Sequence, residues 1–176
     1  MKKNILFLLI IAAFALIIAS LSSYGNNAYA LKYGPSSYSS YPAYYNTHRL
    51  PPPVFFKHKV FKMVVEVDSA NPKVWRQTIN NVRNVMATFG DNPFKYSIEI
   101  VVFGPGLKLL MKKFDKKNEP ILQSLAVYGL MLRACHNTML HFHATTESLF
   151  PFVKVVPAGV VEIVRRETQG YSFLKP

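Results

Sequence analysis

From residue 61 onward, short runs of apolar, β-branched residues alternate with segments that carry one apolar stripe at helical spacing. The runs predicted as strands are Phe61–Val67, Tyr96–Phe103, Leu130–Ala134 with Cys135 at its end, and Val153–Val156. Strands separated by helices pair in parallel through right-handed crossovers. The alternation therefore predicts an α/β domain with three layers, α/β/α, and a mainly parallel sheet.

The first helix is the best defined of the segments between the strands. Asn71 supplies an N-cap and Pro72 the favoured first-turn proline. An apolar stripe at spacings of three and four follows, and a glycine closes the helix; these residues are Trp75, Ile79, Val82, Met86, Phe89 and Gly90. Further helices are expected from about Leu107 and over Pro120–Val127, Thr138–Phe142, Thr145–Phe150 and Val160–Gln169, the last with Val160, Ile163 and Val164 on one face.

The N-terminus has the pattern of a secretory signal peptide over residues 1–30. Lys2 and Lys3 precede an uninterrupted apolar run, Ile5–Ala19, and Ala28-Tyr29-Ala30 offers a cleavage site after Ala30. The mature chain is then expected to be periplasmic or secreted. The alternative is an uncleaved anchor in the inner membrane, because the run approaches spanning length when it is extended through Leu21.

Residues 31–59 differ in composition from the rest, being rich in tyrosine, serine and proline with no helical or strand period. They are predicted to form an extended linker or arm ahead of a domain at 60–176. Lys2 and Lys3 account for two of the 21 basic residues, so 19 remain against 9 acidic ones, a net charge of +10. No nucleic-acid recognition motif interleaves the lysines, so a small anion or an anionic membrane surface is the expected partner of this charge.

Cys135 is the single cysteine of the chain, which excludes a disulfide framework within one subunit. It follows the third predicted strand and precedes a helix, whose N–H groups and dipole favour a thiolate. Working groups of parallel sheets gather beyond the carboxyl ends of the strands, where the turns Gly104-Pro105-Gly106 and Pro157-Ala158-Gly159 also fall. Cys135 is thus a candidate nucleophile, with an inert core cysteine as the alternative.

A soft-metal site is the other chemistry that this region offers. Cys135 is followed by His136, Met139, His141 and His143, which are ligand types that copper and zinc use. Their spacing suits a helix poorly, and the metalloprotease motif is absent, so no metal is expected in the leading hypothesis. The glycine-containing turn also lacks the Lys-Ser/Thr ending of a P-loop.

Several motifs resemble those of the DsrE-like proteins, the sulfur-relay family that includes DsrE, DsrF and YchN. The resemblance covers about Lys59 to Pro176. The matching segments, in order, are Asn80–Asn84, Val101–Leu107, Ala134–Thr138, and Val155–Val164 with Gln169–Tyr171.

The resemblance implies a YchN-type three-layer fold and a homotrimer or homohexamer. It also implies that Cys135 accepts sulfane sulfur as a persulfide and hands it to a thiol of a partner protein. The substrate-binding residues that it nominates are Asn137, Thr138, Gly104, Pro105 and Gly106, with His136 at the edge of the pocket where the family commonly has small residues. The leading hypothesis is therefore an exported sulfur-binding or sulfur-carrier protein without a cofactor, at most like a sulfurtransferase. The alternatives are a non-enzymatic oligomeric module that binds a small anion, and a protein that binds a soft metal through Cys135 and histidines.

Overall fold

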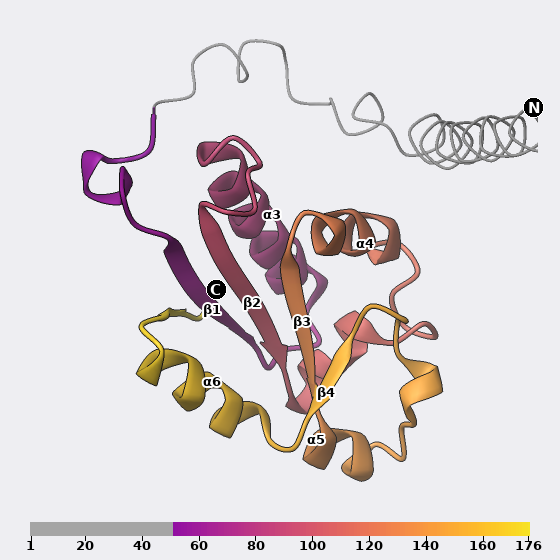
Figure 1. Ribbon diagram of the computed structural model, residues 1–176. Helices are drawn as coiled ribbons and strands as arrows, with labels where there is room; N and C mark the ends of the chain where they lie inside the picture. Colours follow the sequence, from indigo (N-terminus) through magenta and orange to yellow (C-terminus); the bar gives the residue numbers. More distant parts are fainter. Residues whose placement is uncertain (1–50) are drawn as a thin grey trace, which may run out of the picture. The chain divides into compact units, whose positions relative to one another are not determined.

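The computed structural model describes residues 51–176, which form one five-stranded sheet with the order β4-β3-β2-β1-β5 (Figure 1). All neighbouring strands are parallel. The strands are β1 (Phe61–Val67), β2 (Tyr96–Val102), β3 (Leu130–Cys135), β4 (Lys154–Val156) and β5 (Ser172–Leu174). The predicted signal peptide, residues 1–30, and the arm up to residue 50 lie outside the described residues.

Helices cover both faces of the sheet, so the predicted three-layer fold is confirmed. On one face lie α3 (Pro72–Thr88) and α4 (Glu119–Val127), and on the other lies α6 (Gly159–Thr168). The short helix α5 (His136–His141) follows β3 directly, and the 3-10 segments are η2 (Val54–Phe56), η3 (Gly104–Leu110) and η4 (Thr146–Ser148). None of the helices in this part of the chain is long and apolar enough to span a membrane.

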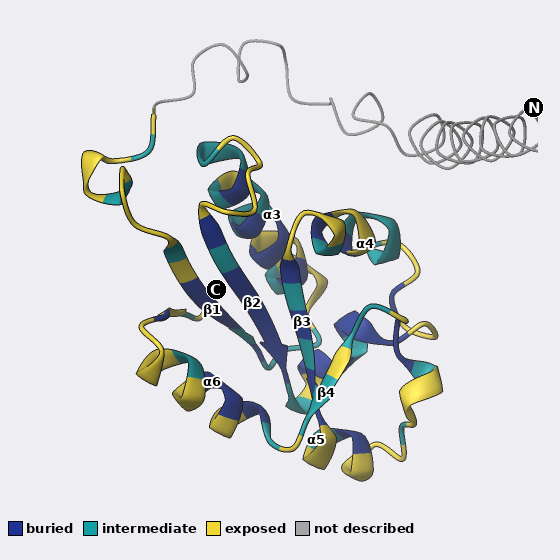
Figure 2. Ribbon diagram, viewed as in Figure 1, coloured by how far each residue is buried: buried dark blue, intermediate teal, exposed yellow. Residues whose placement is uncertain are grey.

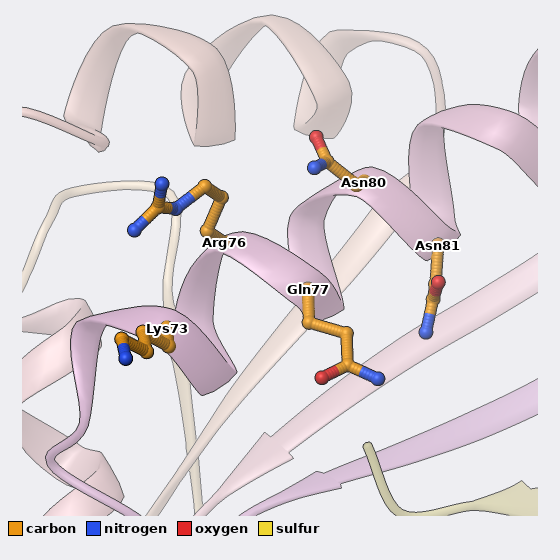
Figure 3. Close-up of a pocket in the computed structure, with 5 residues that line it drawn as sticks. All are labelled: Lys73, Arg76, Gln77, Asn80 and Asn81. Carbon is orange, nitrogen blue, oxygen red and sulfur yellow. The ribbon is translucent and has the colours of Figure 1, made fainter.

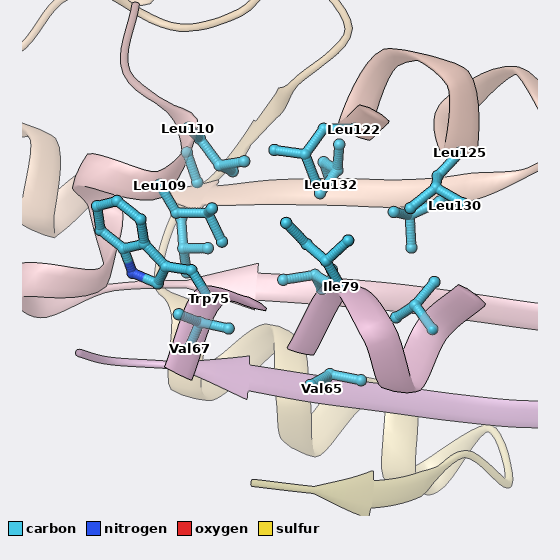
Figure 4. Packing of buried hydrophobic residues seen from close by; sticks show 14 of the residues in the cluster. Val65, Val67, Trp75, Ile79, Leu109, Leu110, Leu122, Leu125, Leu130 and Leu132 are labelled. Carbon is cyan, nitrogen blue, oxygen red and sulfur yellow. The ribbon is translucent and has the colours of Figure 1, made fainter. Parts of the chain in front are cut away.

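The main core lies between the sheet and α3, as the stripe on that helix predicts. Trp75 and Ile79 of α3 pack against the strand side chains of this face, among them Val65 and Val67 of β1 (Figure 4). The side chain of Asn71 caps the helix, since its Oδ1 accepts a hydrogen bond from the Lys73 N–H at 2.9 Å. The opposite face of the sheet has a much smaller apolar cluster, so other interactions must hold α6 in place.

Four predicted elements differ from the structure. The segment after β2 is a 3-10 helix that begins at Gly104 instead of an α-helix from about Leu107, and α5 begins at His136 instead of Thr138. The expected helix Thr145–Phe150 is reduced to η4, because Leu149 and Phe150 enter the core in extended conformation. The predicted tail contains β5, whose exposed side chains gave no strand pattern; only three residues pair with β1.

The face of α6 was predicted wrongly. Ile163 is buried, but Val160 and Val164 are exposed, and the buried positions beside Ile163 are Gly159 and Glu162. The helix therefore turns a carboxylate toward the sheet and valines toward solvent. A periodicity count misses this arrangement because it assigns charged residues to the outer face.

Lys175, next to the C-terminus, makes exposed ion pairs with two carboxylates, in contrast to the buried charges described below. The Lys175 ammonium lies 2.7 Å from a Glu66 oxygen and 2.6 Å from an Asp68 oxygen. Exposed pairs of this kind contribute little to stability because water and salt screen them. We expect Lys175→Ala to change the midpoint of thermal unfolding by no more than about 3 °C. A larger loss in a melting curve would show that the C-terminus anchors β5.

Candidate functional site

The candidate site lies at the carboxyl ends of the strands, where the ends of β2, β3 and β4 come together (Figure 1). Cys135 is the last residue of β3 and the N-cap of α5, with only 5% of its surface exposed. Alternation along β3 places Leu132 and Ala134 in the main core and Cys135 on the face that α6 covers. The thiol therefore sits between the end of the sheet and the N-termini of two helices.

Four hydrogen-bond donors around the Cys135 sulfur act on the pKa of its thiol. They are the backbone N–H groups of Asn137 and Thr138 in α5, the backbone N–H of Gly159 at the start of α6, and the Thr138 hydroxyl. Burial raises the pKa of the Cys135 thiol, but these donors together lower it below the ordinary value. The structure thus favours the thiolate, and it draws on two helices to do so.

A third segment fixes the direction of the Thr138 hydroxyl. Its oxygen accepts a hydrogen bond of 3.0 Å from the backbone N–H of Gly104, the first residue of η3. With that lone pair occupied, the hydroxyl proton is free to point to the sulfur of Cys135. The turn after β2 therefore acts on the thiol through Thr138.

Two glycines at the site allow close approach of neighbouring segments. A Cβ on Gly106 would stand 2.1 Å from the backbone oxygen of Val67, so η3 can lie against the end of β1 only with glycine there. A Cβ on Gly159 would stand 2.8 Å from the Phe103 ring. The first turn of α6 therefore reaches the thiol because glycine occupies this position.

A pocket of about 350 Å³ lies beside the first turn of α5, which follows Cys135. Its lining comes from the turn after β2 and from one face of α5, namely Gly104, Pro105, Asn137, Thr138, His141 and Phe142. Thr138 both lines this pocket and donates to Cys135, so it links the pocket to the sulfur. Most of the lining surface is apolar, and the His141 imidazole adds a polar ring.

Four of the predicted substrate-binding residues, Gly104, Pro105, Asn137 and Thr138, line this pocket. Gly106 is buried against β1 and has a packing role. His136 is exposed and is not among the lining residues. His141 and Phe142 were not predicted to line the pocket, although they follow Thr138 at spacings of three and four, which places all three on one side of a helix.

The histidines do not assemble a metal centre with the thiol. Within residues 51–176, no three His, Cys, Asp or Glu side chains are grouped so that they could hold a metal ion. His143 adopts a left-handed backbone conformation with φ of 50° just after α5, and this takes it out of the helix that carries His141. The soft-metal hypothesis therefore has no ligand set in the described part of the chain.

A cluster of buried charges holds α6 against the sheet behind the thiol. Glu99 of β2 is fully buried, and its carboxylate lies 3.1 Å from the Arg133 guanidinium of β3 and 2.5 Å from that of Arg166 in α6. Arg166 also lies 3.2 Å from Glu162, while the Tyr171 and Ser97 hydroxyls share a hydrogen bond of 2.6 Å. This cluster replaces the apolar packing that the α6 face lacks.

The charge states of this cluster follow from its contacts. Burial raises the pKa of Glu99, and the guanidinium groups of Arg166 and Arg133 oppose that rise. Both Glu99 oxygens accept hydrogen bonds from Arg166, so we assign the group as a carboxylate at neutral pH. Hydrogen bonding from Arg165 lowers the pKa of Glu162 to about 2. The sequence signal for this cluster was a glutamate inside an otherwise apolar strand.

A second pocket of about 480 Å³ lies on the outer surface of α3. Figure 3 shows its lining, Lys73, Arg76, Gln77, Asn80 and Asn81, all projecting from that helix. The lining has two cations and three amides but no nucleophile or acid, so it offers no chemistry comparable to that of Cys135. Asn80 and Asn81 belong to the segment Asn80–Asn84, the first of those on which the sequence resemblance is based.

No family model and no curated protein matches the chain. Among solved structures, the chain is similar to MTH1491 from Methanobacterium thermoautotrophicum, a protein of unknown function, with 29% sequence identity and a TM-score of 0.60. The match covers 66% of this chain and 99% of that one. The three-layer architecture thus occurs as a whole protein elsewhere.

Proposed function

We propose that the chain is a DsrE-like protein that binds and carries sulfane sulfur on Cys135. The observation that carries the proposal is the set of four donors around one thiol, three of which belong to residues, Asn137 and Thr138, that also line a pocket. An inert core cysteine needs no such set. The motif segments around Gly104, Cys135 and Gly159 also support the proposal, because in the structure they meet at the sulfur.

The chemistry of loading is a thiol exchange without net oxidation. The Cys135 thiolate attacks the terminal sulfur of a polysulfide, and a bond forms between the two sulfurs. The S–S bond behind the attacked atom breaks, and its electron pair leaves on the shortened polysulfide as a thiolate. The product is a persulfide on Cys135, whose outer sulfur can meet the same N–H donors at the ends of α5 and α6.

Unloading requires a thiol from another molecule, because this chain has one cysteine. The incoming thiolate attacks the outer sulfur, the persulfide bond breaks, and the electron pair returns to Cys135 as its thiolate. The exposed valines of α6, Val160, Val161 and Val164, are suited to a subunit contact. The homotrimer or homohexamer is what the DsrE-like resemblance implies. Export to the periplasm remains part of the proposal on the sequence pattern alone.

Mass spectrometry of the intact protein tests the proposal. The protein is incubated with polysulfide, the excess reagent is removed, and the protein is then rapidly alkylated. We expect the wild type to gain the mass of one or more sulfur atoms in addition to that of the alkyl label. The gain should disappear after treatment with a small thiol. Cys135→Ser is the matched control and should stay unmodified. A wild-type protein that is alkylated on Cys135 but never gains sulfur would refute the carrier function.

The burial of Cys135 favours a second candidate, an oligomeric module that binds a small anion while the cysteine only packs. In that case the folded protein should react with iodoacetamide far more slowly than a small thiol does at the same pH. Unfolding in urea should restore the rate. Fast alkylation of the folded protein would exclude this candidate in favour of a reactive thiol.

A further inference from the structure

Large apolar side chains are exposed where the first three strands begin, at the opposite end of the sheet from Cys135 (Figure 2). Val54, Phe94 and Val127 have 86, 85 and 81% of their surface exposed. They lie in η2, in the turn before β2 and at the end of α4. We call the following six exposed residues the rim: Val54, Phe55, Val60, Phe94, Val127 and Tyr128.

Contacts within the domain join the three segments that carry the rim. The Phe56 ring lies 5.4 Å from that of Phe61, which holds η2 at the start of β1. The Phe61 N–H donates to the Lys95 carbonyl at 2.9 Å, and the Tyr96 hydroxyl donates to the Tyr128 carbonyl at 2.9 Å. These contacts hold the three segments together at one end of the domain.

Basic residues stand among the rim side chains. Lys57, Lys59 and Lys95 are exposed in the same segments, and the Lys59 ammonium lies 3.9 Å from the centre of the Phe55 ring. Asp91 is the acidic residue of these turns. Aromatic and aliphatic side chains mixed with lysines suit the interface of a bilayer, where rings enter the headgroup region and ammonium groups meet lipid phosphates.

We propose that the rim is a docking surface for a membrane that contains anionic lipids. Two further observations favour a bilayer over a second copy of this chain. Two rims placed face to face would bring their lysines together, which opposes association, whereas anionic headgroups neutralise them. The second is that, in the alternative where the N-terminus stays uncleaved as an anchor, the apolar run Ile5–Ala19 is joined through residues 20–50 to Pro51, three residues before the rim begins at Val54.

The lysine-rich turn at residues 112–117 offers a comparison within the same protein. It holds four lysines around Phe114, an exposed aromatic residue with Lys108 and Lys113 near its ring. This turn carries at least as much positive charge as the rim, four lysines against three, but has one exposed apolar side chain instead of six. It is attracted to anionic lipids without the apolar surface that insertion needs.

Tryptophan fluorescence in vesicles tests the proposal on the full chain. Phe94→Trp places a reporter in the rim, Phe114→Trp places one in the lysine-rich turn, and the buried Trp75 gives both variants the same background. In vesicles of phosphatidylcholine and phosphatidylglycerol with brominated acyl chains, we expect the reporter at 94 to shift to shorter wavelength and lose most of its fluorescence. The reporter at 114 should change little.

Dependence on anionic lipid and on the rim lysines distinguishes docking by the rim from attachment through the N-terminal segment alone. Lys57→Glu with Lys59→Glu in the Phe94→Trp chain, or vesicles of phosphatidylcholine alone, should remove most of the quenching. Equal quenching in both lipids would overturn the proposal, because tethering then explains it. Equal quenching of the reporters at positions 94 and 114 would also overturn the proposal. A shift at 94 without lipid that grows with protein concentration would show that a second copy occupies the rim.

Discussion

Replacing Glu99 by glutamine is expected to lower the free energy of unfolding by about 3 kcal/mol, because it leaves two partly buried guanidinium groups without their shared, fully buried carboxylate. Glutamine has nearly the same volume, so the loss reports charge and hydrogen bonding and not a cavity. Arg133 and Arg166 would face an amide that can accept with only one of its two terminal atoms. Urea unfolding of the two proteins at neutral pH measures the difference.

The same measurement distinguishes the charge state of Glu99. Glutamine mimics a protonated carboxyl group, so a neutral Glu99 would make the variant about as stable as the wild type. Equal stability at neutral pH would therefore contradict the assignment as a carboxylate. Glu167→Gln is the matched control, because it makes the same change on the exposed side of α6. This variant should unfold at the same urea concentration as the wild type.

Thr138→Val is expected to slow alkylation of Cys135 at neutral pH by about tenfold, since a hydrogen bond to a charged group contributes about 1.5 kcal/mol or more. Valine keeps the shape of threonine but removes the hydroxyl donor. The pKa of the thiol should rise, so at any pH below that pKa a smaller fraction is thiolate. The rate of iodoacetamide labelling measured against pH gives both the rate and the midpoint.

The midpoint of the pH profile distinguishes a change in the pKa of Cys135 from a change in the exposure of its thiol. A change in exposure of Cys135 alters the rate at every pH and leaves the midpoint where it was. Thr138→Ser retains the hydroxyl that Gly104 orients, so its profile should lie close to that of the wild type. An unchanged midpoint in Thr138→Val would show that the backbone N–H groups alone set the pKa of Cys135.

The sequence was sufficient to predict the parts of the fold that depend on local pattern. The strands β1 to β4 are apolar runs, and α3 has both a capping signal at Asn71 and a complete apolar stripe. The position of Cys135 at the end of β3 followed from the same pattern. Because parallel strands end at one edge, the turn at Gly104 was also expected near the thiol, and the structure places it there.

Contacts between residues far apart in the chain were not predictable in this way. Glu99 and Arg166 are 67 residues apart, and only the folded sheet brings them together. The wrong face assigned to α6 has the same origin, since the buried carboxylate of Glu162 is stable there only because arginines surround it. The strand pattern predicted that the turn at Gly159 falls at the same edge as Cys135, but donation from the Gly159 N–H to the sulfur depends on that placement of α6 and was not predicted.

The parallel sheet also fixes the distance between the rim and Cys135. Every strand runs the same way, so the rim and Cys135 are separated by the length of the strands, and β1 with its seven residues spans about 23 Å. If the rim lies in a headgroup layer, the thiol stands that far out in the aqueous phase. A protein that exchanges sulfur with it must then be soluble, or carry its own reactive thiol at a similar height above the bilayer.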